Sequence, residues 1–301
     1  MRLNGRRISG NIIDRRGSGS GGGGGFNFGG GGGGFKIGGI GGIAGLLIIG
    51  AIALLTGTNP LDLLQGHGVQ NYSIVNNGDY TPTAHEEELA TFASQILAGT
   101  EDVWSEKFRE MGRTYVAPKM VLFTGSVNSA CGGATASVGP FYCSADQTIY
   151  IDLSFFDQME REMHAGGDFA FAYVIAHEVG HHVQYLLGTL DEAHSAMARS
   201  SERVANQISV RTELQADYYA GVWAHGDNEM FGSLEEGDIE EGLNAASKIG
   251  DDYLQKLAYG YTQPETFNHG RSDQRVRWLE KGARLGTVSG GDTFSPSYNS
   301  L

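Results

Sequence analysis

The amino-acid sequence predicts an α+β domain that follows an N-terminal transmembrane helix. Two short runs rich in β-branched and aromatic residues predict strands, and longer segments with helical spacing of apolar residues fill the second half of the chain. An unbroken apolar run near the N-terminus predicts the membrane helix. We therefore expect a small mixed sheet, one helix that carries the functional motif, and a helical C-terminal half.

The N-terminal region divides into a polar part and an apolar part. Residues 1–36 are basic and rich in glycine, which predicts a disordered cytoplasmic tail. Residues 37–55 contain only Ile, Leu, Ala and Gly, about the length needed to cross a bilayer core, and we place the helix at 37–56. The preceding basic region is too long for a cleavable signal peptide, so an uncleaved signal-anchor helix is favoured over a buried core helix.

Charge predicts the orientation of this anchor in the membrane. Five arginines and one lysine precede the apolar run and are opposed by a single acidic residue: Arg2, Arg6, Arg7, Arg15, Arg16, Lys36 and Asp14. The positive-inside rule then keeps the N-terminus cytoplasmic and puts the domain that follows the anchor on the periplasmic or extracellular side. The whole chain has a formal net charge of −14, and the exported part is more acidic still, which argues against nucleic-acid binding.

The chain has two cysteines, Cys131 and Cys143, and both lie in the exported part. The short loop between them favours a disulfide in an oxidising compartment, with two free buried thiols as the alternative. A metal site built on these cysteines is disfavoured because no histidines lie near them in the sequence.

The exported chain begins with a polar, turn-rich linker at 57–84, and the domain that follows spans residues 85–285. Residues 85–111 predict one helix or two helices broken at Gly99, and residues 118–123 and 148–153 predict strands. The remaining helices are predicted at 169–187, at 201–223 with Ser201 as a possible cap, at 235–257 and at 272–284. Residues 286–301 predict a disordered tail.

The most informative segment is His-Glu-Val-Gly-His at residues 177–181, inside the predicted helix 169–187. Histidines four residues apart lie on one helix face, so His177 and His181 can bind one Zn²⁺. Glu178 can accept a proton from a zinc-activated water. A solvated helix face with incidental histidines is the alternative.

A catalytic zinc site needs a third protein ligand and leaves its fourth position to water. We favour Glu213, because its helix face carries small residues that allow a close approach to the motif helix: Ser209, Ala216, Ala220 and Ala224. Asp217 lies one turn further on the same face and could accept the other N–H of a ligand histidine. The alternative third ligands are His194, His225 and His269, whereas His182 points away from the motif face and is left out of the metal shell.

Two segments together resemble a known family. HEVGHHVQ at 177–184 and ELQADYYAGVWA at 213–224 are similar to the bacterial neutral zinc metallopeptidase family (YpfJ-like), and to gluzincin peptidases generally. Shorter matches occur in the cysteine loop, in the second strand and around residues 269–275, so that the resemblance spans roughly 85–285. Tyr218 departs from the family pattern at a position without an assigned role.

This resemblance implies a zincin-like fold and zinc-dependent hydrolysis of peptide bonds. It implies one Zn²⁺ per chain, held by His177, His181 and Glu213, with Glu178 as the general base. The segment around His269 is similar to a histidine motif of membrane-associated gluzincins. His269 is therefore our candidate for stabilising the oxyanion, and Arg275 could orient it or serve the same electrostatic role; an ordinary loop histidine is the alternative.

The expected partners are a peptide or protein substrate and the membrane. Strand 148–153 is the predicted edge for pairing with an extended peptide, and residues 139–142 could line the same cleft or form a structural loop. The rival to an enzyme is an exported binding protein that keeps the scaffold without activity, and the intact Glu178 argues against it. The sequence assigns neither a cleavage specificity nor an oligomeric state.

Overall fold

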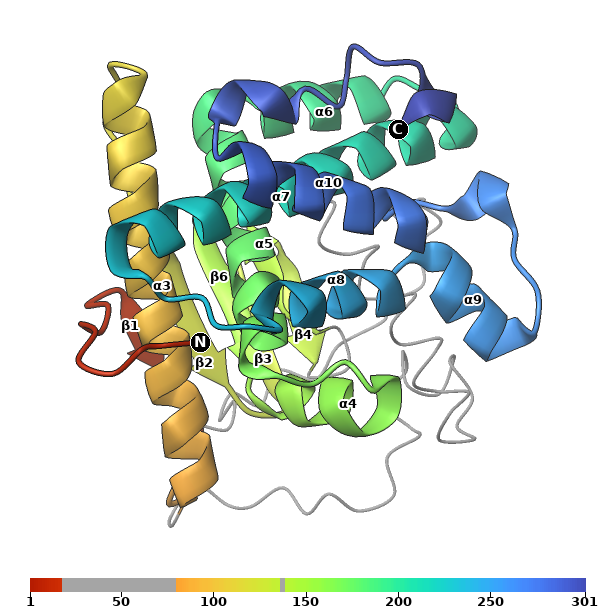
Figure 1. Cartoon of the computed structure of the whole chain (residues 1–301). Coiled ribbons are helices and arrows are strands. Elements are labelled where there is room, and N and C mark those ends of the chain that lie inside the picture. The colour runs from red at the N-terminus through yellow and green to blue at the C-terminus, as the bar shows by residue number, and fades with distance from the viewer. Residues whose placement is uncertain (18–79, 136–138) are drawn as a thin grey trace.

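A computed structural model describes residues 1–17, 80–135 and 139–301, which form a mixed α+β domain (Figure 1). The sheet lies on one side, and helices α5, α7, α8 and α10 form the bulk of the domain beside it. The strands are β1 (Ile12–Asp14), β2 (Lys119–Phe123), β3 (Ser126–Ser129), β4 (Gly132–Thr135), β5 (Phe141–Cys143) and β6 (Thr148–Asp152). The α-helices are α3 (Ala84–Glu110), α4 (Ser154–Met163), α5 (Asp168–Leu187), α6 (Thr189–Met197), α7 (Glu202–Phe231), α8 (Asp238–Lys248), α9 (Asp251–Tyr259) and α10 (Ser272–Leu285).

The main sheet has four strands in the order β1-β2-β6-β5. β1, β2 and β6 are parallel, and β5 is antiparallel to β6, with Tyr142 opposite Ile149. Every residue of β6 is buried, as is typical of a strand with neighbours on both sides. The prediction that β6 is the edge strand is therefore wrong: the edge near the motif helix is β5, which the sequence analysis left in a loop.

The first long helix of the domain, α3, is continuous through Gly99 and is not broken there. It begins with a capping box in which Thr83 accepts a hydrogen bond from the Glu86 backbone and the Glu86 side chain accepts one from the Thr83 backbone. The buried face of α3 includes Trp104 and Phe108, which pack into the main core. Tertiary packing on this face stabilises the helix across the glycine.

Several helix boundaries differ from the predictions. The predicted helix 235–257 is two helices, α8 and α9, because the chain turns at Gly250, where a Cβ atom would lie 2.4 Å from the backbone nitrogen of Ser272. α7 continues to Phe231, and Ser201 is at its N-cap without a side-chain hydrogen bond. α4 and α6 were not predicted at all.

The structure contradicts the predictions of disorder at both ends of the chain. Residues 1–17 include β1, which pairs with β2, and so the first part of the predicted disordered tail 1–36 is ordered on the domain. The final segment runs back over α7 and α10 (Figure 1), with Thr293 and Leu301 buried, so 286–301 is not a disordered tail. Long-range contacts, rather than local propensity, order both ends.

The predicted membrane helix at 37–56 lies outside the described residues, as does most of the predicted linker 57–84. Within the described ranges, no helix combines the length and apolarity that crossing a membrane requires.

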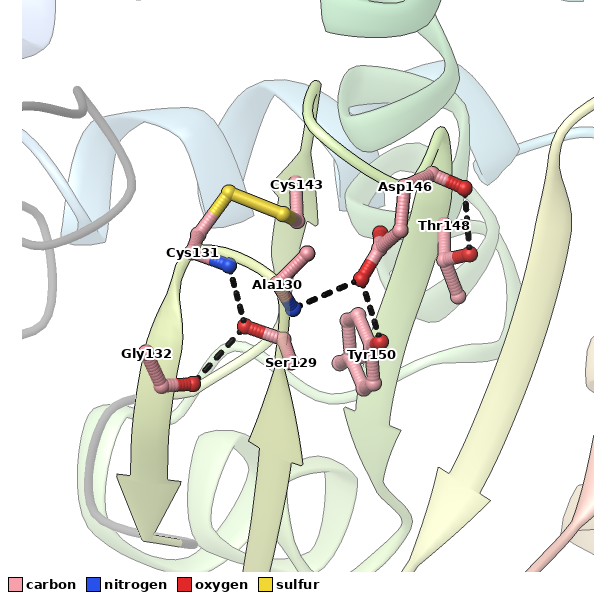
Figure 2. Close-up of a disulfide and its surroundings, with 8 residues drawn as sticks. All are labelled: Ser129, Ala130, Cys131, Gly132, Cys143, Asp146, Thr148 and Tyr150. Carbon is pink, nitrogen blue, oxygen red and sulfur yellow. Dashed lines mark hydrogen bonds between the residues drawn. A yellow bond between two sulfur atoms is a disulfide. The ribbon is translucent and has the colours of Figure 1, made fainter.

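Cys131 and Cys143 form the predicted disulfide, which joins the turn of the β3–β4 hairpin to the end of β5 (Figure 2). Asp146 supports the same corner, because its carboxylate accepts hydrogen bonds from the Ala130 backbone at 2.9 Å and from the Tyr150 hydroxyl at 2.8 Å. Ser129 closes the turn by bonding to the Cys131 backbone and the Gly132 carbonyl. The disulfide therefore anchors the hairpin beside the edge strand β5.

Candidate metal centre

The structure brings His177, His181 and Glu213 together between α5 and α7. One donor atom from each residue lies within 4.8 Å of the others. Nε2 of His177 is 3.2 Å from Glu213 Oε2, and Nε2 of His181 is 3.6 Å from Glu213 Oε1. Ligand atoms about 2.0–2.1 Å from a tetrahedral zinc ion are separated by roughly 3.3 Å, so the three donors fit that ion.

Close packing of the two helices makes this convergence possible. At Gly180, inside the motif, a Cβ atom would lie 2.9 Å from the Ala216 carbonyl oxygen and 3.1 Å from its Cα. Only a glycine leaves room for the α7 backbone at that distance. The prediction of a close approach through small α7 residues is confirmed at Ala216, and Gly180 is the matching residue on α5. A short carboxylate such as Glu213 can then reach the histidines.

Asp217 lies one turn beyond Glu213 and accepts the second N–H of His177, at 2.8 Å between Nδ1 and Oδ1. The same carboxylate accepts hydrogen bonds from the Tyr173 hydroxyl at 2.6 Å and from Arg275 Nε and Nη2, each at 2.8 Å. We call Asp217, Tyr173 and Arg275 the charged support. It fixes the tautomer of His177 so that Nε2 faces Glu213.

The charged support also determines the protonation of His177. Burial alone would lower its pKa, but the Asp217 carboxylate and the hydrogen bond to it raise the pKa to about 9. Burial likewise raises the pKa of Glu213, but the neighbouring histidines lower it to about 2. Without a metal, His177 and Glu213 therefore form a buried ion pair at neutral pH.

A different set of groups holds His181. Its Nδ1 lies 2.9 Å from Gln184 Oε1, and the Gln184 amide donates to the Thr212 carbonyl at 2.7 Å and to Gln215 Oε1 at 3.1 Å. Gln215 in turn donates to the Gly291 carbonyl at 2.8 Å. We call Gln184, Gln215 and the Gly291 carbonyl the amide support. It carries no charge, so burial lowers the pKa of His181 to about 4 despite the attraction of Glu213.

Glu178 is buried and is not one of the three converging donors. Burial raises its pKa to about 7, with the Glu213 charge adding to the shift, while His177 and a hydrogen bond from the Tyr142 backbone oppose it. A carboxyl group with a pKa near neutrality is suited to exchange protons in both directions.

His269 is buried near this group but is not one of the three converging donors. Asp251 accepts a hydrogen bond from His269 Nδ1 at 2.9 Å and three more from the backbone nitrogens of Asn268, His269 and Gly270. Burial lowers the pKa of His269, but the Asp251 carboxylate outweighs that effect and raises it. Arg275 bonds to Asp217 instead of His269, so the expectation that Arg275 orients His269 is wrong. Asp251 is the residue that orients His269.

His182 and His225 have structural partners of their own. His182 Nε2 donates to the Val116 carbonyl at 2.6 Å, and its Nδ1 then accepts from the Tyr142 hydroxyl at 2.9 Å. His225 Nδ1 lies 2.8 Å from the Ala283 carbonyl, and neither His194 nor His225 belongs to the group of converging donors. The geometry therefore favours Glu213 over the alternative histidines.

Sequence reasoning missed four residues of the centre: Tyr173, Gln184, Gln215 and Asp251. Tyr173 and Gln184 had a usable signal, because each lies one helical turn from a motif histidine and so on its face of α5. Gln215 and Asp251 depend on contacts between distant segments, for which the sequence offered no signal.

With this geometry described, comparison with known proteins identifies the family. The model of the family described as "Putative neutral zinc metallopeptidase" matches residues 1–294. The chain belongs to this family. It is 44% identical over 300 residues to YpfJ of Escherichia coli K12, an alignment that covers 99% of this chain and all of that protein. It is 36% identical over 254 residues to an uncharacterised protein of Mycobacterium tuberculosis H37Rv, covering 81% of this chain and 85% of the relative.

No solved structure matches the chain. The family description implies zinc, and His177, His181 and Glu213 are a group that could hold it; YpfJ itself is described as an uncharacterised protein.

Proposed function

We propose that this chain is a zinc-dependent peptidase of the gluzincin type, with a zincin-like arrangement of sheet, motif helix and glutamate helix. The observation that carries the proposal is the orientation of His177, His181 and Glu213. Nε2 of each histidine faces the Glu213 carboxylate, while each Nδ1 is hydrogen-bonded to a separate partner, Asp217 or Gln184. A chance cluster of buried polar groups has no need for this division of the two ring nitrogens.

When bound by these three side chains, Zn²⁺ supplies a Lewis acid for the scissile carbonyl and lowers the pKa of a water to about 7. Glu178 accepts the proton of the attacking water as the water oxygen bonds to the carbonyl carbon. The C–N bond then breaks, and Glu178 delivers that proton to the leaving amine. Burial raises the pKa of Glu178 to about 7 in the metal-free protein, and the charge of a bound Zn²⁺ would lower it, which favours the carboxylate that accepts the first proton.

His269 is the proposed partner of the negative charge that develops on the carbonyl oxygen. Its pKa is raised by Asp251, which favours the imidazolium form that stabilises an anion best. Asp251 also holds the ring in place through Nδ1, leaving Nε2 available. His269 and Asp251 thus act as donor and positioning residue.

The proposed substrate is an extended peptide that pairs with β5. Among the described strands, β5 has β6 as its one partner and so leaves its other edge open. The β5 residue Tyr142 touches Glu178 through its backbone, which puts this edge next to the general base. Main-chain pairing at β5 would align a peptide carbonyl with the donors, independently of the peptide's side chains.

We also propose that the domain works in an oxidising compartment outside the cytoplasm. The Cys131–Cys143 disulfide supports this, because such bonds are rare in cytosolic proteins. Attachment to the membrane through residues 37–56 stays a prediction.

The full-length protein tests the proposal in detergent, with zinc stoichiometry and peptide hydrolysis measured on the same sample. Glu178→Gln should bind zinc and lose at least about 100-fold in kcat, because the general base is removed. Glu202→Gln is the matched control, since Glu202 is an exposed glutamate at the start of α7. Undiminished hydrolysis in Glu178→Gln would rule out the mechanism. Stoichiometric zinc without hydrolysis of any peptide would instead favour a binding protein.

The third ligand has a separate test. Glu213→Ala should abolish stoichiometric zinc binding, while His225→Ala should leave it unchanged. Full zinc retention in Glu213→Ala would move the assignment to another side chain.

A further inference from the structure

Residues 1–17 lie on the domain as an ordered segment, which we call the N-terminal segment. Its strand β1 extends the main sheet in parallel with β2, with Ile12 opposite Met120 and Asp14 opposite Leu122. Upstream of β1 the segment runs beside α3 (Figure 1), where the Ser9 backbone nitrogen donates to the Ser94 carbonyl at 3.1 Å. The family model also begins at residue 1, so this segment belongs to the matched unit.

Arg6 has a fitted binding site on the domain. Its guanidinium pairs with Asp227 near the end of α7, with Nη2 at 2.8 Å and Nη1 at 3.3 Å from the carboxylate, and Asp227 is 1% exposed. The guanidinium also lies 3.7 Å above the Phe231 ring. On the opposite helix, a Cβ atom at Gly99 would be 2.7 Å from Asp227 and 2.9 Å from Arg6. The absence of a side chain at Gly99 therefore leaves the space on α3 that this ion pair fills.

A second group of contacts converges on Glu101 of α3. Its carboxylate accepts hydrogen bonds from Arg7 at 2.8 Å, from Ser9 at 2.5 Å and from the Asn11 amide at 2.8 Å. Arg7 also bonds to Asp102 at 2.6 Å. A domain face rich in carboxylates thus complements the basic segment.

Arg16 makes the last of these contacts at the end of the segment. It bonds to the Glu86 carbonyl at 2.9 Å and to the Glu87 carboxylate at 2.8 Å. The segment ends at Gly17, where a Cβ atom would lie 2.1 Å from the Tyr80 ring. Gly17 and Tyr80 are therefore neighbours, and the described chain ends after Gly17 and resumes at Tyr80 at the same point of the domain surface.

We infer that the N-terminal segment is a docked part of the peptidase domain and lies on the same side of the membrane. Arg6, Arg7 and Arg16 are docking residues in this arrangement, whereas the sequence analysis treated them as signals that keep the N-terminus cytoplasmic. A single crossing between Gly17 and Tyr80 would put the segment and the domain on opposite sides. The apolar run 37–55 is long enough for one crossing but not for two, so it does not act as a single-pass anchor in the docked protein.

Thiol accessibility in whole cells tests the shared compartment. The protein has no free cysteine, so Ile8→Cys and Tyr261→Cys introduce single reporters on the segment and on the domain, at positions that are 62% and 57% exposed. We expect a membrane-impermeant maleimide to label both reporters under the same condition. It should label both before lysis of the inner membrane, or label both only after lysis. Labelling of one reporter before lysis and of the other only after it would overturn the inference.

Cross-linking tests the docking itself. Ser9 and Ser94 are both buried, and the Ser9 nitrogen lies 3.1 Å from the Ser94 hydroxyl, so Ser9→Cys with Ser94→Cys should form a disulfide within one chain upon oxidation of the full-length protein in membranes. Ile8→Cys with Ser94→Cys is the control, because Ile8 faces solvent. A cross-linked dimer, or no cross-link beyond the control, would overturn docking within one chain.

A charge exchange tests the role of Arg6 without depending on either thiol. Arg6→Asp and Asp227→Arg should each lower the Tm of the purified full-length protein by about 5 °C or more, because a buried charge loses its partner. The double exchange should recover at least half of that loss. Single variants with unchanged Tm, or a double variant with the summed loss, would contradict the docking contact.

Discussion

The two motif histidines are one helical turn apart, yet the charged support and the amide support give them opposite protonation states. Asp217 raises the pKa of His177 to about 9, whereas neutral Gln184 leaves burial to lower the pKa of His181 to about 4. In the metal-free protein at neutral pH, the first histidine is therefore charged and the second is neutral. The division leaves one of the two motif histidines uncharged in the metal-free protein, and it predicts that the two supports differ in their importance for folding and for zinc binding.

The largest effect is expected from removing the centre of the charged support. Asp217→Ala leaves the buried Arg275 without its partner and should lower the free energy of unfolding by about 3–5 kcal/mol. It should also weaken zinc binding by about 10–100-fold, because His177 loses the group that fixes its tautomer. Denaturant unfolding and competition with a zinc chelator measure the two quantities.

The control is Asp273→Ala, which removes a half-exposed aspartate from exposed ion pairs on α10 and should change stability by less than about 1 kcal/mol. Adding Arg275→Met to Asp217→Ala should recover stability but not zinc affinity. Recovery of both would mean that Asp217 acts through the fold alone.

The pH dependence of zinc binding separates the two histidines. His177 has a raised pKa of about 9, so below pH 9 zinc must displace its proton, and the affinity should fall about tenfold per pH unit. His181 is already neutral until the pH approaches about 4 and adds nothing above that value. Below pH 7 a zinc-bound water would keep its proton, so the apparent affinity at pH 5 should be about tenfold lower than at pH 6, with about one proton released per zinc.

Calorimetric titration in buffers of different ionisation enthalpy counts that proton. Release of two protons at pH 6, where a zinc-bound water with a pKa of about 7 would keep its own proton, would mean that the amide support does not keep His181 neutral.

The sequence was most informative where function depends on one helix face. His177, Glu178 and His181 follow from their spacing, and Glu213 and Asp217 follow from the one-turn interval on the next helix together with its small residues. The structure brings His177, His181 and Glu213 together because the helical repeat makes neighbours of residues three or four positions apart, whereas the role of Glu178 stays a proposal.

The rest depends on contacts between segments that are distant in the chain. Glycines and arginines in residues 1–17 predict disorder and a membrane signal, yet carboxylates on α3 and α7 order them. Strand β5 was missed because it has only three residues, and β6 was assigned to an edge because local sequence does not indicate the number of its neighbours. The sequence of α5 predicts an amphipathic helix with one exposed face, but the polar face is buried as well as the apolar one.

A smaller effect is expected from replacing Gln184, the residue of the amide support that contacts His181. Gln184→Leu removes the acceptor for His181 Nδ1 and leaves the Thr212 carbonyl without its donor, but it leaves no charge unpaired. Zinc affinity should fall about tenfold, at the lower end of the range for such supports, with a loss of stability of about 1–3 kcal/mol. Chelator competition measures the affinity, and Gln184→Glu offers a sharper variant, because a carboxylate at this position should raise the His181 pKa and make zinc release a second proton. An unchanged proton count in Gln184→Glu would contradict the contact.

The smallest effect is expected at Gln215, which touches His181 only through Gln184. Gln215→Ala removes the link between Gln184 and the Gly291 carbonyl, so the C-terminal segment loses one of its ties to α7. Because Gln184 keeps its bond to Thr212, zinc affinity should fall by only a few-fold. Residues that act in series give non-additive effects, so Gln215→Ala should add nothing to the zinc affinity of Gln184→Leu. An additive double variant would mean that Gln215 influences the centre by another route, through the packing of the C-terminal segment on α7.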